Sequence, residues 1–181
     1  MSWIPPSFRP FWMGEPGEIS SPLRRQWMAL VFFVLVCGLA ALYASLYAPS
    51  ASGVWGWYPK LQKPAWAPEP AWTGQVSAAY YAVLAVSMWR VWRTGAFRNV
   101  PITMAGFGAV LFLQAIWSTL FYGMHNPLLG FADLAVIALL GSVLWLTYRQ
   151  LDPLAGWLWL AYLAWLGVLL AVNGAIWWLN G

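Results

Sequence analysis

The chain has 181 residues, of which 62% are hydrophobic and 8% are charged. Soluble domains carry about 25% charged residues, so this composition excludes a water-soluble domain and predicts an integral membrane protein. The net charge of +4 lies between the apolar runs, where it indicates orientation in a membrane rather than nucleic-acid binding.

The first 25 residues form an extension rich in proline and aromatic residues, which has little helix potential. Two interpretations stay open. The segment either anchors at the membrane interface with its arginines at lipid phosphates, or docks along a partner, because aromatic and arginine side chains are common interface anchors. The candidate docking residues are Trp3, Phe8, Arg9, Phe11 and Trp12.

Five apolar runs follow, each long enough to cross the hydrocarbon core as a helix of about 20 residues. Backbone groups within lipid must pair internally, and the runs are continuous rather than alternating, so strands are excluded. The pattern predicts an all-α membrane protein, a bundle of five transmembrane helices in residues 26–181. The expected helices are 27–47, 72–92, 102–122, 128–148 and 154–179.

Basic residues predict the orientation of this bundle. The positive-inside rule places the N-terminus in the cytoplasm and residues 49–71 outside, in a multi-pass protein of the bacterial inner membrane. Only Lys60 and Lys63 lie on the outer side. The basic residues on the inner side are Arg9, Arg24, Arg25, Arg90, Arg93, Arg98 and Arg149.

The segment between the first two runs is the most unusual part of the chain. Residues 55–72 hold four prolines, two lysines and five aromatic residues. A loop of this composition is costly to order, so we expect it to be held in place for a functional reason.

Three polar residues lie within the expected helices. Asp133 is either a ligand or proton contact, or an interfacial residue bonded to a neighbouring group, because carboxylates inside a membrane are expensive. Gln114 and Asn173 are either hydrogen-bonded contacts between helices or ligand contacts.

The sequence contains few residues in arrangements that could support catalysis or bind a metal. His125 is the only histidine and lacks the further ligands that a metal site needs. No set typical of acid–base or nucleophilic catalysis is present, so we expect no enzyme. Light-driven chemistry at a tryptophan would leave no such pattern and stays open.

Small residues on the third helix indicate a close helix contact, either inside the bundle or between two copies of the chain. The candidate dimer residues are Ala105, Gly106, Gly108 and Ala109.

Several motifs together resemble the TspO/MBR family, also called the translocator protein or tryptophan-rich sensory protein family. The run from Trp57 to Pro68 resembles its first-loop signature, and residues 117–123 (W-S-T-L-F-Y-G) resemble the end of its third helix. Tyr162, Trp165 and Asn173 resemble its fifth helix. The match extends over residues 27–180.

This resemblance implies a five-helix bundle in which residues 49–71 cap a pocket for a porphyrin, a sterol or a similar flat ligand, with no cofactor required. The pocket residues that it implies are Trp57, Trp66, Trp117, Asp133, Trp165 and Asn173. Gln114 stands where the family usually has asparagine, and we include it among the candidate ligand contacts. Trp178, Leu179 and Asn180 replace the basic end of the proposed sterol motif.

Two functions follow from these observations. The first is a membrane receptor or transporter for a tetrapyrrole-like molecule. The second is a structural or assembly subunit of a larger membrane complex, docked through the N-terminal extension. The family's occurrence beside pigment genes in phototrophic bacteria makes a photosynthetic pigment–protein complex the example of that second function.

Overall fold

The computed structural model describes residues 23–47, 56–95 and 102–181. Within these residues, the predicted all-helical architecture with five long helices is confirmed. The elements are α1 (Leu23–Ser45), the short 3-10 helix η3 (Tyr58–Lys60), α2 (Pro70–Arg93), α4 (Ile102–Ser118), the π-helical turn η4 (Thr119–Gly123), α5 (Pro127–Leu151) and α6 (Pro153–Asn180).

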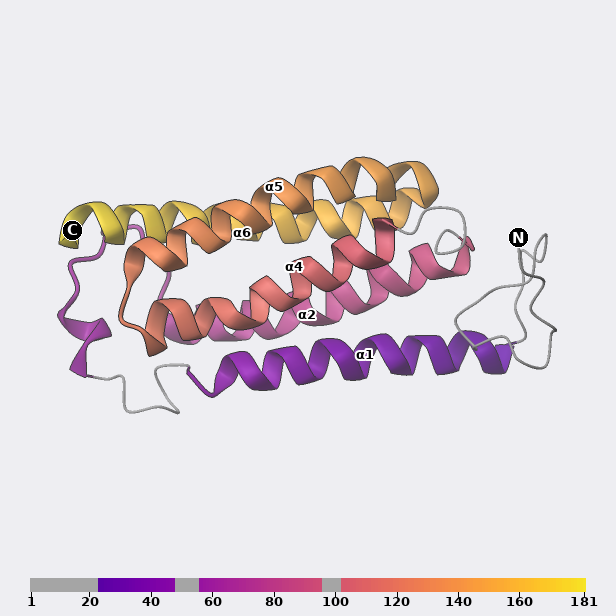
Figure 1. The fold of residues 1–181 in the computed structure, drawn as a ribbon, viewed down its shortest axis with the longest axis horizontal. Helices are drawn as coiled ribbons and strands as arrows, with labels where there is room; N and C mark the ends of the chain where they lie inside the picture. The colour runs from indigo at the N-terminus through magenta and orange to yellow at the C-terminus, as the bar shows by residue number, and fades with distance from the viewer. Residues whose placement is uncertain (1–22, 48–55, 96–101) are drawn as a thin grey trace.

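The five long helices close into a ring. Helix α1 packs against α2 and α4, α2 packs against α6, and α5 packs against both α6 and α4. Figure 1 shows α1 along one side of the bundle, α5 and α6 along the other, and α2 and α4 between them. Four of the five are long and apolar enough to span a membrane by themselves: α1, α4 with η4, α5 and α6. Helix α2 is more polar and lies between α1 and α6 in the ring.

Helix boundaries follow local chemistry. The Asp152 carboxylate accepts a hydrogen bond from the Ala155 backbone N–H at 2.8 Å and caps α6, as the Asp152–Pro153 pair predicts. The Asn126 side chain caps α5 in the same way. Helix α1 begins at residue 23 rather than 27, because the helix continues past the apolar run through two arginines.

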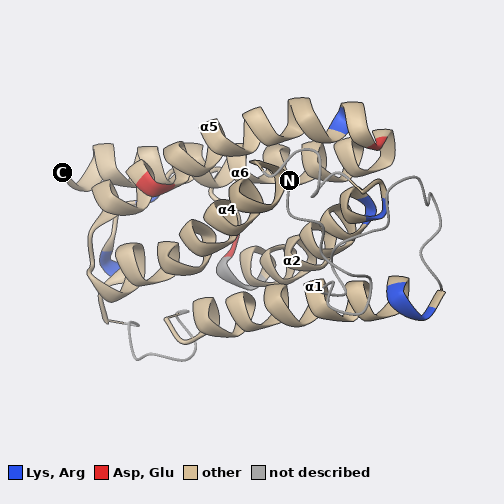
Figure 2. Ribbon diagram, turned by 45° about the vertical axis from the view of Figure 1, so that its right-hand side comes forward, with Lys and Arg blue, Asp and Glu red and all other residues tan. Residues whose placement is uncertain are grey.

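Charge is distributed unevenly between the two ends of the bundle (Figure 2). Lys60 and Lys63 lie at the end formed by η3 and the start of α2. The arginines of the described residues lie at the opposite end, near the start of α1 and the ends of α2 and α5: Arg24, Arg25, Arg90, Arg93 and Arg149. The same asymmetry underlies the predicted orientation, with the N-terminus in the cytoplasm. The orientation itself stays a prediction.

The arginine end is held by polar contacts between elements. Arg90 of α2 forms two parallel hydrogen bonds with the Asp152 carboxylate, at 3.0 and 2.9 Å. Burial raises the pKa of Asp152, but the hydrogen bonds from Arg90 and from the backbone outweigh it, so the net pKa lies below its usual range. The Ser87 hydroxyl also donates to the Ala155 carbonyl at 3.0 Å. These bonds fix α2 to the α5–α6 turn.

Candidate ligand site at the loop end of the bundle

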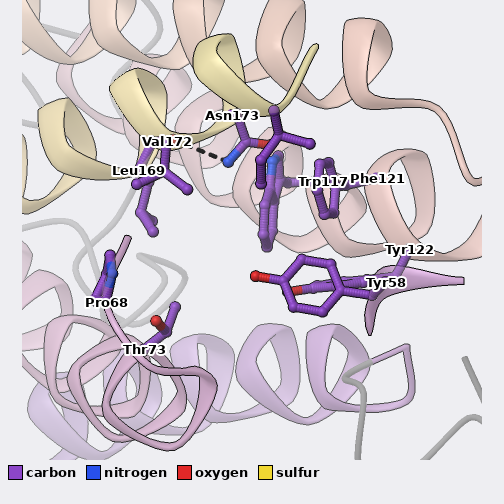
Figure 3. A pocket seen from close by; sticks show the side chains of 10 residues that line it. Tyr58, Pro68, Thr73, Trp117, Phe121, Tyr122, Leu169, Val172 and Asn173 are labelled. Atoms are coloured by element: carbon purple, nitrogen blue, oxygen red, sulfur yellow. Dashed lines mark hydrogen bonds between the residues drawn. The ribbon is translucent and has the colours of Figure 1, made fainter. Parts of the chain in front are cut away.

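A small cavity lies inside the bundle at the end opposite the arginines. The volume of this cavity is about 20 Å³, which is room for roughly one water molecule. Figure 3 shows the Trp117 and Phe121 rings next to each other, with Tyr58 and Tyr122 together on one side and Pro68 and Thr73 apart from them. The lining residues are Tyr58, Pro68, Thr73, Trp117, Phe121, Tyr122, Leu169, Val172, Asn173 and Ile176.

Aromatic rings from the loop and from α4–η4 form part of the wall of this cavity. The Trp117 and Phe121 rings stack at 12° with centroids 5.4 Å apart. Tyr58 packs edge-on against Tyr122 at 5.4 Å, and Trp57 against Phe121 at 5.6 Å. Such ring pairs add about 0.5–1.5 kcal/mol beyond the area they bury, so the loop is bound to the bundle largely through these contacts.

The π-helical turn η4 contributes two consecutive residues to the cavity wall. A π turn holds one more residue than an α turn, so it changes which faces the following residues present. Phe121 is buried and Tyr122 is half-buried, and both line the cavity. The sequence alone predicts a continuous helix to residue 122, so it misses this turn.

The loop is also joined to the end of α6 by a side-chain amide. The Gln62 backbone N–H donates to Asn180 Oδ1 at 2.8 Å, and Asn180 Nδ2 donates to the Gln62 carbonyl at 2.9 Å. Within the loop, Lys63 Nζ donates to the Leu61 carbonyl at 3.1 Å and lies 4.6 Å from the Tyr58 ring centroid. Burial raises the pKa of Tyr58, so its phenol is a neutral hydrogen-bond donor at neutral pH.

The turn η4 and helices α5 and α6 meet closely at Gly130. A Cβ atom at this position would lie 2.8 Å from a Phe121 ring carbon and 3.2 Å from Asn173 Oδ1. Only glycine fits there without moving Phe121, which is fully buried.

Four buried side-chain atoms on α4, α5 and α6 have no hydrogen-bond partner among the described residues. They are two donors, Trp117 Nε1 and Trp165 Nε1, and two acceptors, Asp133 Oδ2 and Asn173 Oδ1. Asp133 and Asn173 are only 7% and 3% exposed. An unpaired buried polar group costs about 1–3 kcal/mol, so each of these atoms calls for an explanation.

A separate polar cluster is fully paired. Gln114 Nε2 donates to the Tyr80 hydroxyl at 2.8 Å, and the Tyr162 hydroxyl donates to Gln114 Oε1 at 2.9 Å. Gln114 thus makes the interhelical contacts expected of an amide inside a membrane, here joining α4 to α2 and α6. A ligand that bound to this amide would have to break one of these bonds.

The predicted site residues therefore fall into several groups. Trp117 and Asn173 line the cavity, and Trp57 packs behind it against Phe121 and His125. Trp165 and Asp133 contribute unpaired buried atoms without lining the cavity. Trp66 is 58% exposed on the loop. Their roles in ligand binding stay predictions.

Several lining residues were not among the predicted contacts. Tyr58, Phe121 and Tyr122 lie within the two quoted motifs, so the signal was present. On α6, Leu169 lies one turn before Asn173, and Val172 lies next to it. Their apolar identity does not distinguish them from other residues of the same helix.

The other predicted surfaces are only partly described. Gly106 faces α5, since a Cβ there would lie 2.6 Å from a Leu144 methyl carbon, whereas Ala105, Gly108 and Ala109 are exposed. The small-residue patch thus serves internal packing at one position and leaves the other three for the predicted dimer. The predicted docking residues Trp3, Phe8, Arg9, Phe11 and Trp12 lie outside the described residues.

Comparison with known proteins decides the family. The model of the TspO/MBR family matches residues 23–179, which is most of the chain. The chain belongs to the TspO/MBR family. The matched range includes α1, α2, α4 and α5, the loop between α1 and α2, and all but the last residue of α6.

Three relatives show the range of that similarity. The "Tryptophan-rich protein TspO" of Archaeoglobus fulgidus is 34% identical over 81% of this chain and 96% of its own length. "Protein CrtK" of Rhodobacter capsulatus is 28% identical over 83% and 91%. The human "Translocator protein" is also 28% identical, over 83% and 89%. With its apolar helices, the family identifies this chain as a multi-pass membrane protein.

Proposed function

We propose that this protein is a membrane receptor for a flat, largely apolar ligand of the tetrapyrrole type, bound at the loop end of the bundle. The observation that carries the proposal is an aromatic-lined cavity between helices that hold four unpaired buried atoms, two of which, Trp117 Nε1 and Asn173 Oδ1, belong to residues that line the cavity. Relatives named "Translocator protein" and "Tryptophan-rich sensory protein" support a receptor or regulator rather than an enzyme.

The chemistry of these residues suits such a ligand. Indole and phenol rings stack on a flat macrocycle, while a few polar groups set its orientation. Two unpaired donors and two unpaired acceptors match a molecule that both accepts and donates hydrogen bonds. A porphyrin with carboxylates and pyrrole N–H groups has both, whereas a sterol offers a single hydroxyl.

Binding would require the cavity to open. Pockets for drug-sized ligands hold roughly 300–1,000 Å³, far more than the cavity between these rings. Because Tyr58 lines the cavity from the loop and Trp57 packs against Phe121 behind it, outward movement of the loop would separate both from Phe121 and Tyr122. We therefore expect binding to follow loop opening.

Protoporphyrin IX titration of the full chain in detergent micelles tests the proposal, with tryptophan fluorescence as the readout. Trp117→Phe keeps an aromatic side chain but removes the N–H and part of the ring area, so we expect affinity to fall by at least about fivefold, the loss equivalent to one hydrogen bond of about 1 kcal/mol. Trp157→Phe is the matched control, because Trp157 lies on the outside of α6 and is 68% exposed. Linear quenching without saturation, shared by the wild type and both variants, would contradict the proposal.

A further inference from the structure

Two tryptophan–arginine pairs lie at the arginine end of the bundle, away from the cavity. Arg93 stacks over Trp89 on α2, and Arg149 stacks over Trp145 on α5, each with its guanidinium carbon 4.8 Å from a ring centroid. Both pairs have the i, i+4 spacing that brings side chains together on a helix surface. In both, the arginine is exposed and the tryptophan is half-buried.

The Trp89 ring is fixed in place by the neighbouring helix. Its Nε1 donates to the Gln26 carbonyl in the first turns of α1, at 3.0 Å. The exposed Arg24 lies two residues before Gln26, so a further basic side chain belongs to the same corner of the bundle. Arg93 is thus stacked on a ring that cannot turn freely.

No carboxylate of the described residues is available to pair with these two arginines. The described acidic residues are Glu69, Asp133 and Asp152. The first two belong to the loop half of the molecule, and Arg90 holds Asp152 in two hydrogen bonds. The charges of Arg93 and Arg149 therefore face the surroundings of the protein at the end of two membrane helices.

We propose that these two pairs bind phosphate groups of anionic phospholipids in the leaflet at this end. A guanidinium stacked on a ring keeps its N–H edge open for bidentate contact with phosphate, and stacking reduces the freedom that it loses on binding. Tryptophan favours the depth of lipid headgroups, which brings the arginine to the level of the phosphates. A lipid rather than a soluble phosphate is favoured because both pairs lie on outer helix surfaces, one on each of two helices that are not neighbours in the ring.

Native mass spectrometry of the full chain from mixed micelles tests this site. The micelles contain equal parts of phosphatidylcholine and phosphatidylglycerol with identical acyl chains, and the measured quantity is the ratio of the two lipids retained on the protein. We expect the wild type to retain phosphatidylglycerol preferentially. Each of Arg93→Gln and Arg149→Gln should lower the preference about fivefold, which corresponds to about 1 kcal/mol per arginine, and the double variant roughly 25-fold.

Two control proteins separate a site from a general charge effect. The double variant Lys60→Gln/Lys63→Gln removes the same charge from the opposite end and should keep the preference. Arg93→Lys/Arg149→Lys keeps the charge but loses the planar fork, and it should show an intermediate loss. The proposal is overturned if the wild type shows no preference for phosphatidylglycerol, or if Lys60→Gln/Lys63→Gln loses as much of this preference as Arg93→Gln/Arg149→Gln. It is also overturned if Arg93→Lys/Arg149→Lys shows the same preference as the wild type.

Discussion

Replacing Asn180 with alanine should loosen the loop that covers the cavity. The substitution removes both hydrogen bonds between the Asn180 amide and the Gln62 backbone. Each is worth about 0.5–1.5 kcal/mol net, so together they contribute about 1–3 kcal/mol to the closed position. We therefore expect the population with an open loop to rise roughly 5- to 150-fold.

Hydrogen exchange measured by mass spectrometry on peptides from residues 56–69 detects this opening directly. The Gln62 amide should exchange faster by the same factor, while peptides of α5 keep their protection. Gln62→Ala is the matched control, because only the backbone of Gln62 takes part in the two bonds. The reasoning is refuted if Asn180→Ala leaves the exchange unchanged, or if Gln62→Ala accelerates it equally.

Two further substitutions test packing and charge. Gly130→Ala should lower thermal stability by about 1–3 kcal/mol, because the added methyl group would press on the buried Phe121 ring. Gly108→Ala is the control and should not lower it, because its methyl group would meet nothing within 4 Å. Equal melting temperatures of the two variants would contradict this explanation. Arg90→Met should cost roughly 1.5–3 kcal/mol at pH 7. The folded pKa of Asp152 is depressed, so the stability that this pair adds is present above the unfolded pKa near 3.8 and is lost as the pH falls through the folded pKa. Melting curves at decreasing pH should therefore show a smaller acid loss in Arg90→Met than in the wild type, and parallel curves would contradict this assignment.

The sequence predicts the helices well because each of them carries a long apolar run. The cap at Asp152 also follows a local rule, since an aspartate before a proline is typical of a helix start. Trp117 and Asn173 were predicted at the site from motifs. The contact between Gln62 and Asn180 was not predictable, because it joins residues 118 positions apart through a backbone that carries no sequence signal.

The small size of the cavity was also beyond prediction. Its size depends on the mutual positions of Tyr58, Phe121 and Tyr122, which come from the loop and from a π-helical turn. Motifs indicate which residues lie together at the end of the bundle. The orientations of their rings decide whether space remains between them, and motifs do not predict these orientations.

The π-helical turn η4 has a consequence for comparing this chain with its relatives. A π turn holds an extra residue relative to an α turn, so a chain shorter by one position between residues 119 and 123 would continue as an α-helix. The residues on one side of the deletion would then be rotated by about 100° relative to those on the other side, so the aromatic residues of this turn would present different faces to the cavity. A one-residue gap at this place in an alignment would therefore mark relatives with a differently shaped site, even where every aromatic residue is retained.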